Sequence, residues 1–262
     1  MPPLQFVWDL FGLEGKTAVV VGGTGVLCGA MAEGLAAAGA RTILAGRNRE
    51  RGEERVRTIQ AQGGQAHFEP VDVTDRASIE ALCHRCFETY GRVDCLVNGP
   101  GANSPTPFLE ITDEEWNRIF EVNNTSIFRL CQVFGRRVIA EGHPSSFINI
   151  SSMSAIRPLS RVFTYSASKA AMTNLTLNLA REWGPHRIRV NMLTPGFFPA
   201  EQNRKVLSPD RVESILKHTP MNRFGEAQEL VGAILLLASD KAGGFITGHS
   251  LVVDGGFACT SI

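Results

Sequence analysis

Short runs of β-branched and apolar residues alternate with helical segments along nearly the whole chain. The strand-like runs span residues 17–21, 41–45, 65–71, 92–98, 145–151, 187–193 and 251–254. Strands separated by helices are expected to pair in parallel, because a parallel neighbour is reached through a crossover connection. Several runs are apolar throughout, as strands are when both sheet faces are covered. We therefore expect an α/β fold, a single domain over residues 1–262 with a doubly wound, parallel, seven-stranded sheet of Rossmann type. Helices are expected up to residue 38 and over about 49–62, 76–91, 113–140 and 164–183.

The charge balance argues against a nucleic-acid-binding or membrane protein. The 26 Lys and Arg residues match the 26 Asp and Glu residues in number, and both signs are interspersed. No apolar run approaches the roughly 20 residues of a membrane-spanning helix, and the first residues do not resemble a secretory signal. Six cysteines, four of them in segments expected to be buried, favour reduced thiols and a cytoplasmic protein.

Cys83 and Cys86 form a CxxC pair with His84 between them. A structural zinc site needs four ligands, usually two such pairs, and the sequence holds no second pair. The segment is expected to be an amphipathic helix with both cysteines on one face. We interpret the pair as core packing and expect no metal site.

A glycine-rich turn follows the first strand and precedes a helix. Glycines there allow a tight turn whose backbone N–H groups approach a pyrophosphate at the helix N-terminus. A glycine turn without a ligand is the alternative. The expected cofactor contacts in this turn are Gly22, Gly23, Thr24, Gly25, Val26 and Leu27.

The tip of the second strand bears on the choice of dinucleotide. An acidic residue there would bind the ribose hydroxyls of NAD, but the tip reads Ala-Gly-Arg47-Asn48. The Arg47 guanidinium suits a 2′-phosphate, which favours NADP(H) and leaves NAD(H) as the second choice. The alternative is that Arg47 is one of several solvated arginines in RNRERGEER.

Four polar residues form the predicted catalytic group. Tyr165 and Lys169 lie four residues apart on one face of an expected helix. A nearby ammonium group lowers a tyrosine pKa from its usual value of about 10, so the pair can exchange a proton with a ketone or an alcohol. Ser152 follows the fifth strand and offers a hydroxyl to the substrate oxygen. Asn123 is a polar residue inside an otherwise apolar helix.

With these residues in place, the chain resembles a short-chain dehydrogenase/reductase over essentially its full length, from LEGKTAVVVGG to LVVDGG. The resemblance implies hydride transfer with NAD(P)(H), with Tyr165 as the acid/base and Lys169 holding the ribose. It also implies that Ser152 orients the substrate oxygen and that Asn123 supports a water in a proton relay. The cofactor contacts outside the glycine turn would be Arg47, Asn48, Asp72, Val73, Asn98, Gly99, Tyr165, Lys169, Pro195, Gly196 and Phe198.

The glycine turn departs from the family's usual Thr-Gly-x-x-x-Gly-x-Gly pattern. Val21 replaces the Thr, Val26 the middle glycine and Cys28 the last, whereas Gly25 fits the Gly-x-x-Gly spacing of related branches. We expect the turn to hold a dinucleotide by a variant backbone path. Cys28 is small enough to pack where the helix approaches the strand.

Several loop segments most resemble the branch of the family that interconverts fructuronate and mannonate, the ketone and alcohol of a hexuronic acid. These segments are GTGVL, NGPGANSPTP, PGFFPAEQNRKVL and HTPMNRFGE. The candidate substrate residues are Asn103, Ser152, Asn203 and Arg204. Arg204 would pair with the carboxylate, with Arg157 or Arg161 as alternatives. These candidate polar residues could instead belong to a variable lid loop without a role in substrate binding.

Three function classes remain. The first is a sugar-acid or polyol oxidoreductase, such as a fructuronate reductase or a gluconate 5-dehydrogenase-like enzyme. The second is a 3-oxoacyl thioester reductase, and the third is a non-catalytic dinucleotide-sensing protein of the same fold. The filled catalytic positions favour an enzyme acting on a small molecule. The resemblance also suggests a homotetramer or homodimer, because the C-terminal segment ends in small and apolar residues that can pack across a two-fold axis.

Overall fold

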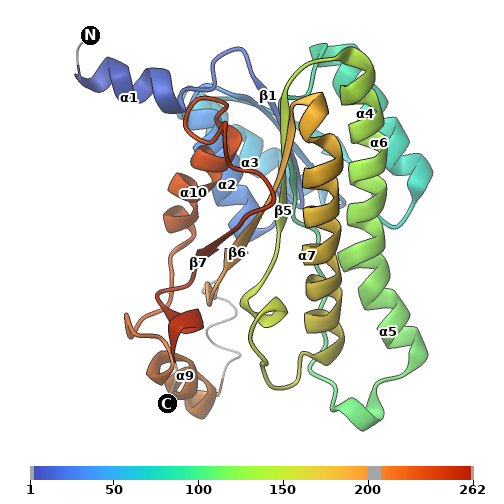
Figure 1. Ribbon diagram of the computed structural model, residues 1–262, viewed down its shortest axis with the longest axis vertical. Coiled ribbons are helices and arrows are strands. Elements are labelled where there is room, and N and C mark those ends of the chain that lie inside the picture. Colours follow the sequence, from blue (N-terminus) through green and yellow to red (C-terminus); the bar gives the residue numbers. More distant parts are fainter. Residues whose placement is uncertain (1–2, 200–207, 261–262) are drawn as a thin grey trace.

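The strands of the computed structural model form one parallel, seven-stranded sheet (Figure 1). The structure describes residues 3–199 and 208–260. The strand order is β3-β2-β1-β4-β5-β6-β7, and the predicted doubly wound α/β fold is confirmed. The strands are β1 (Thr17–Val21), β2 (Arg41–Gly46), β3 (Gln65–Pro70), β4 (Cys95–Asn98), β5 (Ser145–Ile150), β6 (Ile188–Pro195) and β7 (Ser250–Val253).

Helices cover both faces of the sheet (Figure 1). Helices α4, α6 and α7 pack on one face, and α2, α3 and α10 pack on the other. No helix in the described parts of the chain is long and apolar enough to cross a membrane. The helices are α1 (Pro3–Phe11), α2 (Val26–Ala37), α3 (Arg49–Ala61), α4 (Arg76–Tyr90), α5 (Asp113–Phe120), α6 (Ser126–Glu141), α7 (Phe163–Trp183), α9 (Pro209–Lys217) and α10 (Val231–Ala238).

Two helical features differ from the sequence-based expectation. The helix expected over 113–140 contains a π-helical turn, Glu121–Thr125, between α5 and α6. The sequence-based expectation does not include α1, residues PLQFVWDLF, whose two polar residues share one face, where Gln5 Nε2 donates to Asp9 Oδ1 at 2.7 Å. In the structure α1 extends away from the body of the molecule (Figure 1), with Leu4 and Phe6 exposed.

The sheet separates two hydrophobic cores, which share alternate residues of each strand. Val20 of β1 packs in the core with α2 and α10, whereas Val19 and Val21 pack in the core with α4, α6 and α7. Cys83 and Cys86 of α4 lie in the second core, and desolvation raises the pKa of both thiols to about 12. The interpretation of the CxxC pair as core packing is therefore confirmed.

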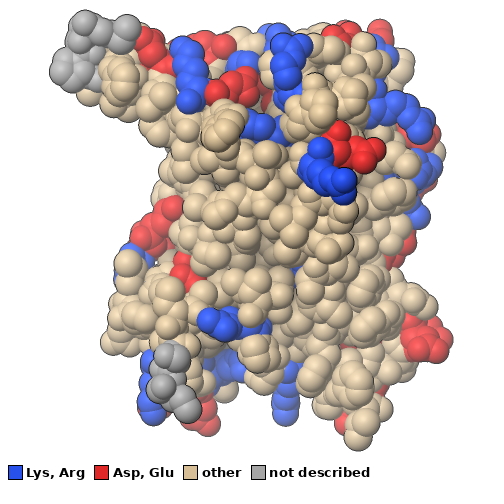
Figure 2. All heavy atoms as spheres, viewed as in Figure 1, with Lys and Arg blue, Asp and Glu red and all other residues tan. Residues whose placement is uncertain are grey.

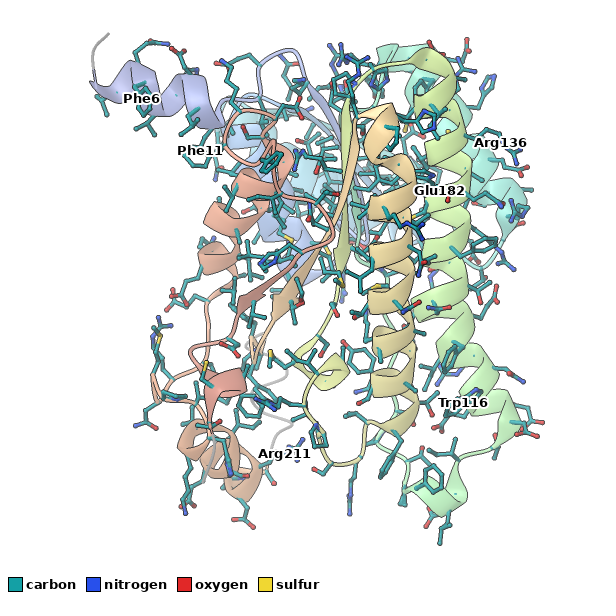
Figure 3. The ribbon with its side chains drawn as sticks, viewed as in Figure 1. Phe6, Phe11, Trp116, Arg136, Glu182 and Arg211 are labelled. Carbon is teal, nitrogen blue, oxygen red and sulfur yellow. The ribbon has the colours of Figure 1, made fainter. Side chains whose placement is uncertain are left out.

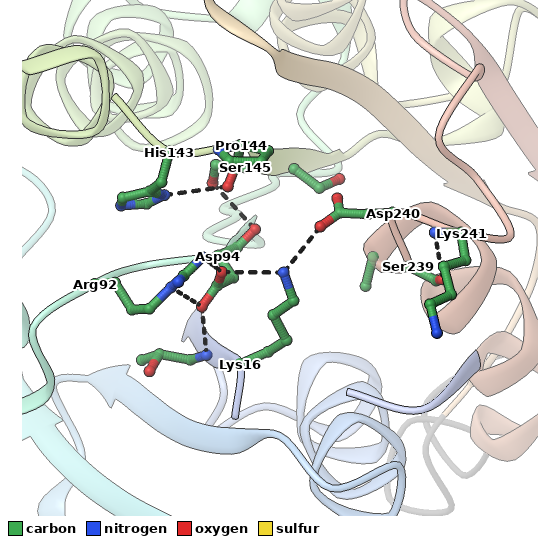
Figure 4. A network of polar contacts seen from close by, with 12 residues as sticks. Lys16, Arg92, Asp94, His143, Pro144, Ser145, Ser239, Asp240 and Lys241 are labelled. Atoms are coloured by element: carbon green, nitrogen blue, oxygen red, sulfur yellow. Dashed lines mark hydrogen bonds and ion pairs between the residues drawn. The ribbon is translucent and has the colours of Figure 1, made fainter. Parts of the chain in front are cut away.

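A network of charged groups joins the strands at their amino ends, opposite to the loops that follow the strands (Figure 4). Asp94 is 5% exposed, accepts a hydrogen bond from the Thr17 backbone N–H at 2.9 Å and pairs with Arg92. Lys16 bridges Asp94 and Asp240, with its Nζ 3.4 Å and 2.9 Å from the two carboxylates. These contacts tie β1 and β4 to the end of α10, and they leave the carboxyl edge of the sheet for binding.

Candidate active site

The glycine turn lies at the carboxyl edge of the sheet, where β1 ends and α2 begins. Gly22 has a φ of +84°, a left-handed conformation that glycine adopts readily. A Cβ at Gly22 would lie 2.9 Å from the Gly99 carbonyl oxygen, so the turn also passes too close to its neighbour for a side chain. Gly25 is the N-cap of α2 and has no side chain to cover the first N–H groups of the helix. Those groups can bind an anion.

Cys28 and Gly99 share one small space between α2 and the loop after β4. The Cys28 side chain is buried, and its Sγ lies 3.9 Å from the Gly99 carbonyl oxygen. A Cβ at Gly99 would lie only 2.1 Å from that sulfur. The cysteine fits because residue 99 has no side chain, which confirms that Cys28 packs at this place.

A pocket of about 140 Å³ opens beside the glycine turn, where β1, β2 and β3 end. Gly22, Arg47, Asp72 and Val73 are among its lining residues, so the structure brings together predicted cofactor contacts from three loops. The pKa of Asp72 is lowered by hydrogen bonds from Thr74 and, to a smaller extent, by the charge of Arg47. The pocket thus combines a carboxylate with a nearby guanidinium.

Two predicted cofactor contacts use their side chains within the protein. The Asn48 side chain caps α3 by accepting a hydrogen bond from the Arg51 backbone N–H at 2.9 Å. The Asn98 Nδ2 donates to Asn149 Oδ1 at 2.9 Å. Other predicted contacts in the glycine turn are Thr24, which packs on Gly46, Val26, which is exposed, and Leu27, which packs against the first core.

Ser152, Tyr165 and Lys169 come together at the carboxyl end of β5. Ser152 lies just past the strand, and the other two side chains come from the start of α7. The Ser152 side chain lies beside the Tyr165 phenol and lowers its pKa by hydrogen bonding to the charged form. The Lys169 Nζ lies 5.7 Å from the centroid of the Tyr165 ring and donates to the Ile150 carbonyl at 2.7 Å. A phenol, a hydroxyl and an ammonium group are therefore available at one place.

Desolvation controls the titration of the two catalytic candidates. It lowers the pKa of Lys169 to about 8, against a small opposing effect of Cys28. It raises the pKa of Tyr165, against an opposing effect of the hydrogen bond with Ser152. The net pKa of Tyr165 is therefore raised, and not lowered as the proximity of Lys169 predicts. Removal of the phenol from water outweighs the nearby charge, and the phenol stays protonated at neutral pH.

Asn123 lies in the π-helical turn and is fully buried. Its Oδ1 accepts a hydrogen bond from the Ala102 backbone N–H at 2.7 Å. Its Nδ2 donates to the Ala102 carbonyl at 2.9 Å and to Ser168 Oγ at 3.0 Å. The amide thus fastens the loop after β4 to α7, the helix that carries Tyr165 and Lys169.

Comparison with known proteins decides the family. A family model described as enoyl-(acyl carrier protein) reductase matches residues 26–258. The chain belongs to the short-chain dehydrogenase/reductase family. It is 38% identical to the uncharacterized oxidoreductase UxuB of Bacillus subtilis, over 95% of this chain and 97% of that protein.

Solved structures of family members agree with this assignment. A gluconate 5-dehydrogenase from Burkholderia cenocepacia, in complex with NADP and tartrate, has a TM-score of 0.91 and 32% identity and covers 97% of this chain and 100% of its own. A provisionally named D-mannonate oxidoreductase from Haemophilus influenza, with bound NAD, has a TM-score of 0.91 and 32% identity and covers 97% and 99%. The protein is an NAD(P)-dependent oxidoreductase, so the alternative of a non-catalytic sensor is set aside.

In this short-chain dehydrogenase/reductase, the segment just after β6 lines a second pocket, of about 370 Å³, through Phe197 and Phe198. The Gly196 N–H donates to the Val253 carbonyl at 2.8 Å, and a Cβ at Gly196 would lie 2.7 Å from the Asp254 Cα. Pro195 and Gly196 therefore lead the chain tightly past β7. Phe198 lines the pocket, so this predicted contact forms part of a cavity wall.

The predicted substrate residues are only partly within the described chain. Asn203 and Arg204 fall in 200–207, outside the described residues. Asn103 is exposed, and its side chain accepts a hydrogen bond from the Ser104 backbone N–H at 2.8 Å. Of the two described candidates, Ser152 is the one that lies beside Tyr165.

The structure describes two of the three arginines considered for the substrate carboxylate. Arg157 donates through Nε and Nη2 to the Ala258 carbonyl, at 3.1 and 2.6 Å, and Arg161 is exposed. Sequence reasoning missed Arg211 of α9, which donates to Ser160 Oγ in the loop between β5 and α7. Figure 3 shows Arg211 between α9 and that loop. The pair is 51 residues apart in sequence, so only the fold reveals it.

Proposed function

We propose that this oxidoreductase interconverts a ketone and a secondary alcohol on a sugar acid, with NADP(H) as its preferred cofactor. The observation that carries the proposal is the convergence of Ser152, Tyr165 and Lys169 at the carboxyl edge of the sheet. The glycine turn suits a dinucleotide, because Gly25 leaves the first N–H groups of α2 without a side-chain cap, so they can bind a pyrophosphate. A bound nicotinamide cofactor supplies or accepts the hydride.

Tyr165 is the proton donor in this proposal. Its raised pKa keeps the phenol protonated, so it can protonate the substrate oxygen as that oxygen gains negative charge. The Ser152 hydroxyl, which lies beside the phenol, orients the same oxygen. In the reverse direction, the nearby Lys169 ammonium stabilises the phenolate that accepts the alcohol proton. Asn123 holds the neighbouring loop and supports the relay of the proton to water.

The preference for NADP(H) rests on Arg47. Its side chain lines the 140 Å³ pocket beside Asp72, at a strand tip without an acidic residue. A guanidinium group can bind a 2′-phosphate through two parallel hydrogen bonds. The Burkholderia gluconate 5-dehydrogenase, which contains NADP, supports this choice.

The substrate class is supported by the similar proteins. A gluconate 5-dehydrogenase and a provisionally named D-mannonate oxidoreductase both act, by their names, on sugar acids. We put the fructuronate/mannonate pair first and 5-ketogluconate, of the same class, second. A 3-oxoacyl thioester reductase is the other candidate, because the chain is also 36% identical to the 3-oxoacyl-(acyl carrier protein) reductase FabG of Escherichia coli.

Arg211 is the described cation best placed for the substrate carboxylate. Arg157 donates two of its N–H groups to the Ala258 carbonyl. Arg211 reaches from α9 to Ser160, in the loop that connects Ser152 to Tyr165. An arginine has five N–H donors, so the bond to Ser160 leaves room for a bidentate contact with a carboxylate.

We propose a homodimer or homotetramer in the cytoplasm. The middle of the face shown in Figure 2, over β7 and α7, is largely free of charged side chains, and the apolar side chains of Phe128 on α6 and Leu177 on α7 are exposed. Such a surface suits a symmetric contact. All six cysteines are free thiols, five of them buried, which favours a reducing compartment.

Replacement of Tyr165 by Phe tests the proton transfer. Tyr165→Phe removes the hydroxyl and keeps the ring, so kcat should fall about 100-fold or more, while the Kd for NADPH, measured by fluorescence titration, stays unchanged. The other tyrosine of the chain, Tyr90, gives a matched control, because Tyr90→Phe should retain turnover. A Tyr165→Phe variant with near-normal kcat would place the proton donor elsewhere.

A further inference from the structure

Ser168 stands between two parts of the catalytic site without facing either pocket. It lies three residues after Tyr165 in α7 and is fully buried. Its Oγ donates to the Tyr165 carbonyl at 2.7 Å and accepts from Asn123 Nδ2 at 3.0 Å. One hydroxyl therefore links the backbone of the proton donor to the amide of Asn123.

The contacts of Asn123 fix which way its amide faces. The carbonyl oxygen accepts from the Ala102 N–H, and the two Nδ2 hydrogens go to the Ala102 carbonyl and to Ser168. A reversed amide would place an NH₂ group against the Ala102 N–H, and it would leave buried polar atoms without partners. Ser168 is the member of this set that belongs to the catalytic helix.

The π-helical turn that contains Asn123 makes the bond to Ser168 important for holding Asn123 in place. A π-turn widens the backbone spiral, so the residues in it are held less well by the regular helical hydrogen bonds. Asn123 sits in that turn, and it meets α7 through the bond to Ser168. The same amide holds Ala102, the neighbour of Asn103, in the loop after β4.

We propose that Ser168 is a positioning residue that sets the orientation of Asn123, and through it the loop after β4, relative to Tyr165. The proposal rests on the proposed catalytic roles of Tyr165 and Asn123. Ser168 contacts neither substrate nor cofactor, since its side chain is buried between helices. Loss of its hydroxyl leaves one Nδ2 hydrogen of Asn123 without an acceptor and frees the amide to tilt.

The first experiment measures the anchored loop without any substrate. Amide hydrogen exchange at Ala102 reports its bond to Asn123 Oδ1. Ser168→Ala should speed exchange at this amide about tenfold. The control is Thr173→Val on the same helix, whose hydroxyl bonds only the Lys169 carbonyl within the described residues, and it should leave the Ala102 amide unchanged. Unaltered exchange at Ala102 in Ser168→Ala would overturn the proposal.

The second experiment is a double-mutant cycle on turnover. Ser168→Ala should lower kcat about tenfold with an unchanged Kd for NADPH, and Ser168→Cys, which keeps a weak donor and acceptor, should recover part of the loss. In an Asn123→Ala background, Ser168→Ala should lower kcat no further, because the two residues act as one unit. Multiplying losses would show that Ser168 does not act through Asn123. Wild-type turnover, measured first, reports on the proposed function separately, and the exchange experiment stands without it.

Discussion

At the scale of single residues, Cys28 and Gly99 compensate for each other in size: the Cys28 side chain occupies the space that a side chain at residue 99 would need. A methyl group at residue 99 would meet the Cys28 sulfur at 2.1 Å. We expect Gly99→Ala to lower the free energy of unfolding by about 1–3 kcal/mol, as overpacking does. In a Cys28→Ala background the sulfur is gone, so the same substitution should cost much less. Urea unfolding of the four proteins measures the coupling, and simple additivity would contradict the shared space.

Arg47 determines the cofactor preference in our account. Arg47→Ala should weaken NADPH binding by about 1.5–3 kcal/mol, the scale of a hydrogen bond to a charged group, and should leave NADH binding nearly unchanged. Fluorescence titration with each dinucleotide measures both. Arg51→Ala, at an exposed arginine in the same segment, serves as the control. Equal losses for NADPH and NADH would show that Arg47 does not bind the 2′-phosphate.

Local residue patterns can be predicted from sequence, whereas distant contacts cannot. Helix geometry predicts that Tyr165 and Lys169, four residues apart, share one face. The position of Ser152 just after a strand predicts that it lies at the carboxyl edge of the sheet. The raised pKa of Tyr165 depends on burial, which arises only when separate segments pack. Likewise Cys28 and Gly99 are 71 residues apart, so the sequence alone shows a departure at residue 28 but not its compensation.

At the scale of secondary-structure elements, periodic patterns are predictable and their interruptions are not. The strands appear as apolar runs because both sheet faces are covered. The π-turn of Glu121–Thr125 contains residues of low helix propensity, but nothing in the residues specifies a π-turn between α5 and α6. The sequence nevertheless indicates Asn123 as a candidate, because an amide in an otherwise apolar helix needs partners.

Helix α9 brings Arg211 to the loop between β5 and α7, and in the proposed role this arginine binds the substrate carboxylate, so its effect should depend on substrate charge. Arg211→Ala should raise KM for fructuronate about tenfold or more by removing a charge-assisted contact, and should leave KM for an uncharged ketose unchanged. Lys217→Ala, at an exposed lysine on the same helix, should alter neither. Initial rates with both ketones measure the difference. Equal KM changes for the charged and the neutral ketone would remove Arg211 from carboxylate recognition.

At the scale of the whole molecule, buried thiols in both cores predict a loss of stability at high pH. Desolvation raises the pKa of Cys28 to about 11 and that of Cys83, Cys86, Cys95 and Cys131 to about 12, from 9.0. Above pH 9 the unfolded chain loses these protons and the folded chain keeps them. Each thiol then lowers the free energy of unfolding by up to about 1.4 kcal/mol per pH unit.

Lys169 has the opposite effect on the pH dependence of stability, but it is one group against five thiols. Its pKa is lowered from 10.5 to about 8, so between these values the folded protein gains stability as pH rises. The five thiols should dominate, and urea unfolding under reducing conditions should show a falling free energy of unfolding from pH 9 to pH 11. A Cys83→Ala/Cys86→Ala variant should give a shallower fall. A flat profile would mean that the thiols ionise as readily in the folded state as in the unfolded chain.

The most direct test of the central claim is the initial rate of NADPH oxidation with fructuronate, 5-ketogluconate and a 3-oxoacyl thioester, measured side by side. Our account predicts a kcat/KM for one of the two sugar acids at least tenfold above that for the thioester, and loss of that rate in Tyr165→Phe. Turnover of the thioester alone would contradict the assignment to sugar acids. Sugar-acid turnover that survives Tyr165→Phe would contradict the mechanism.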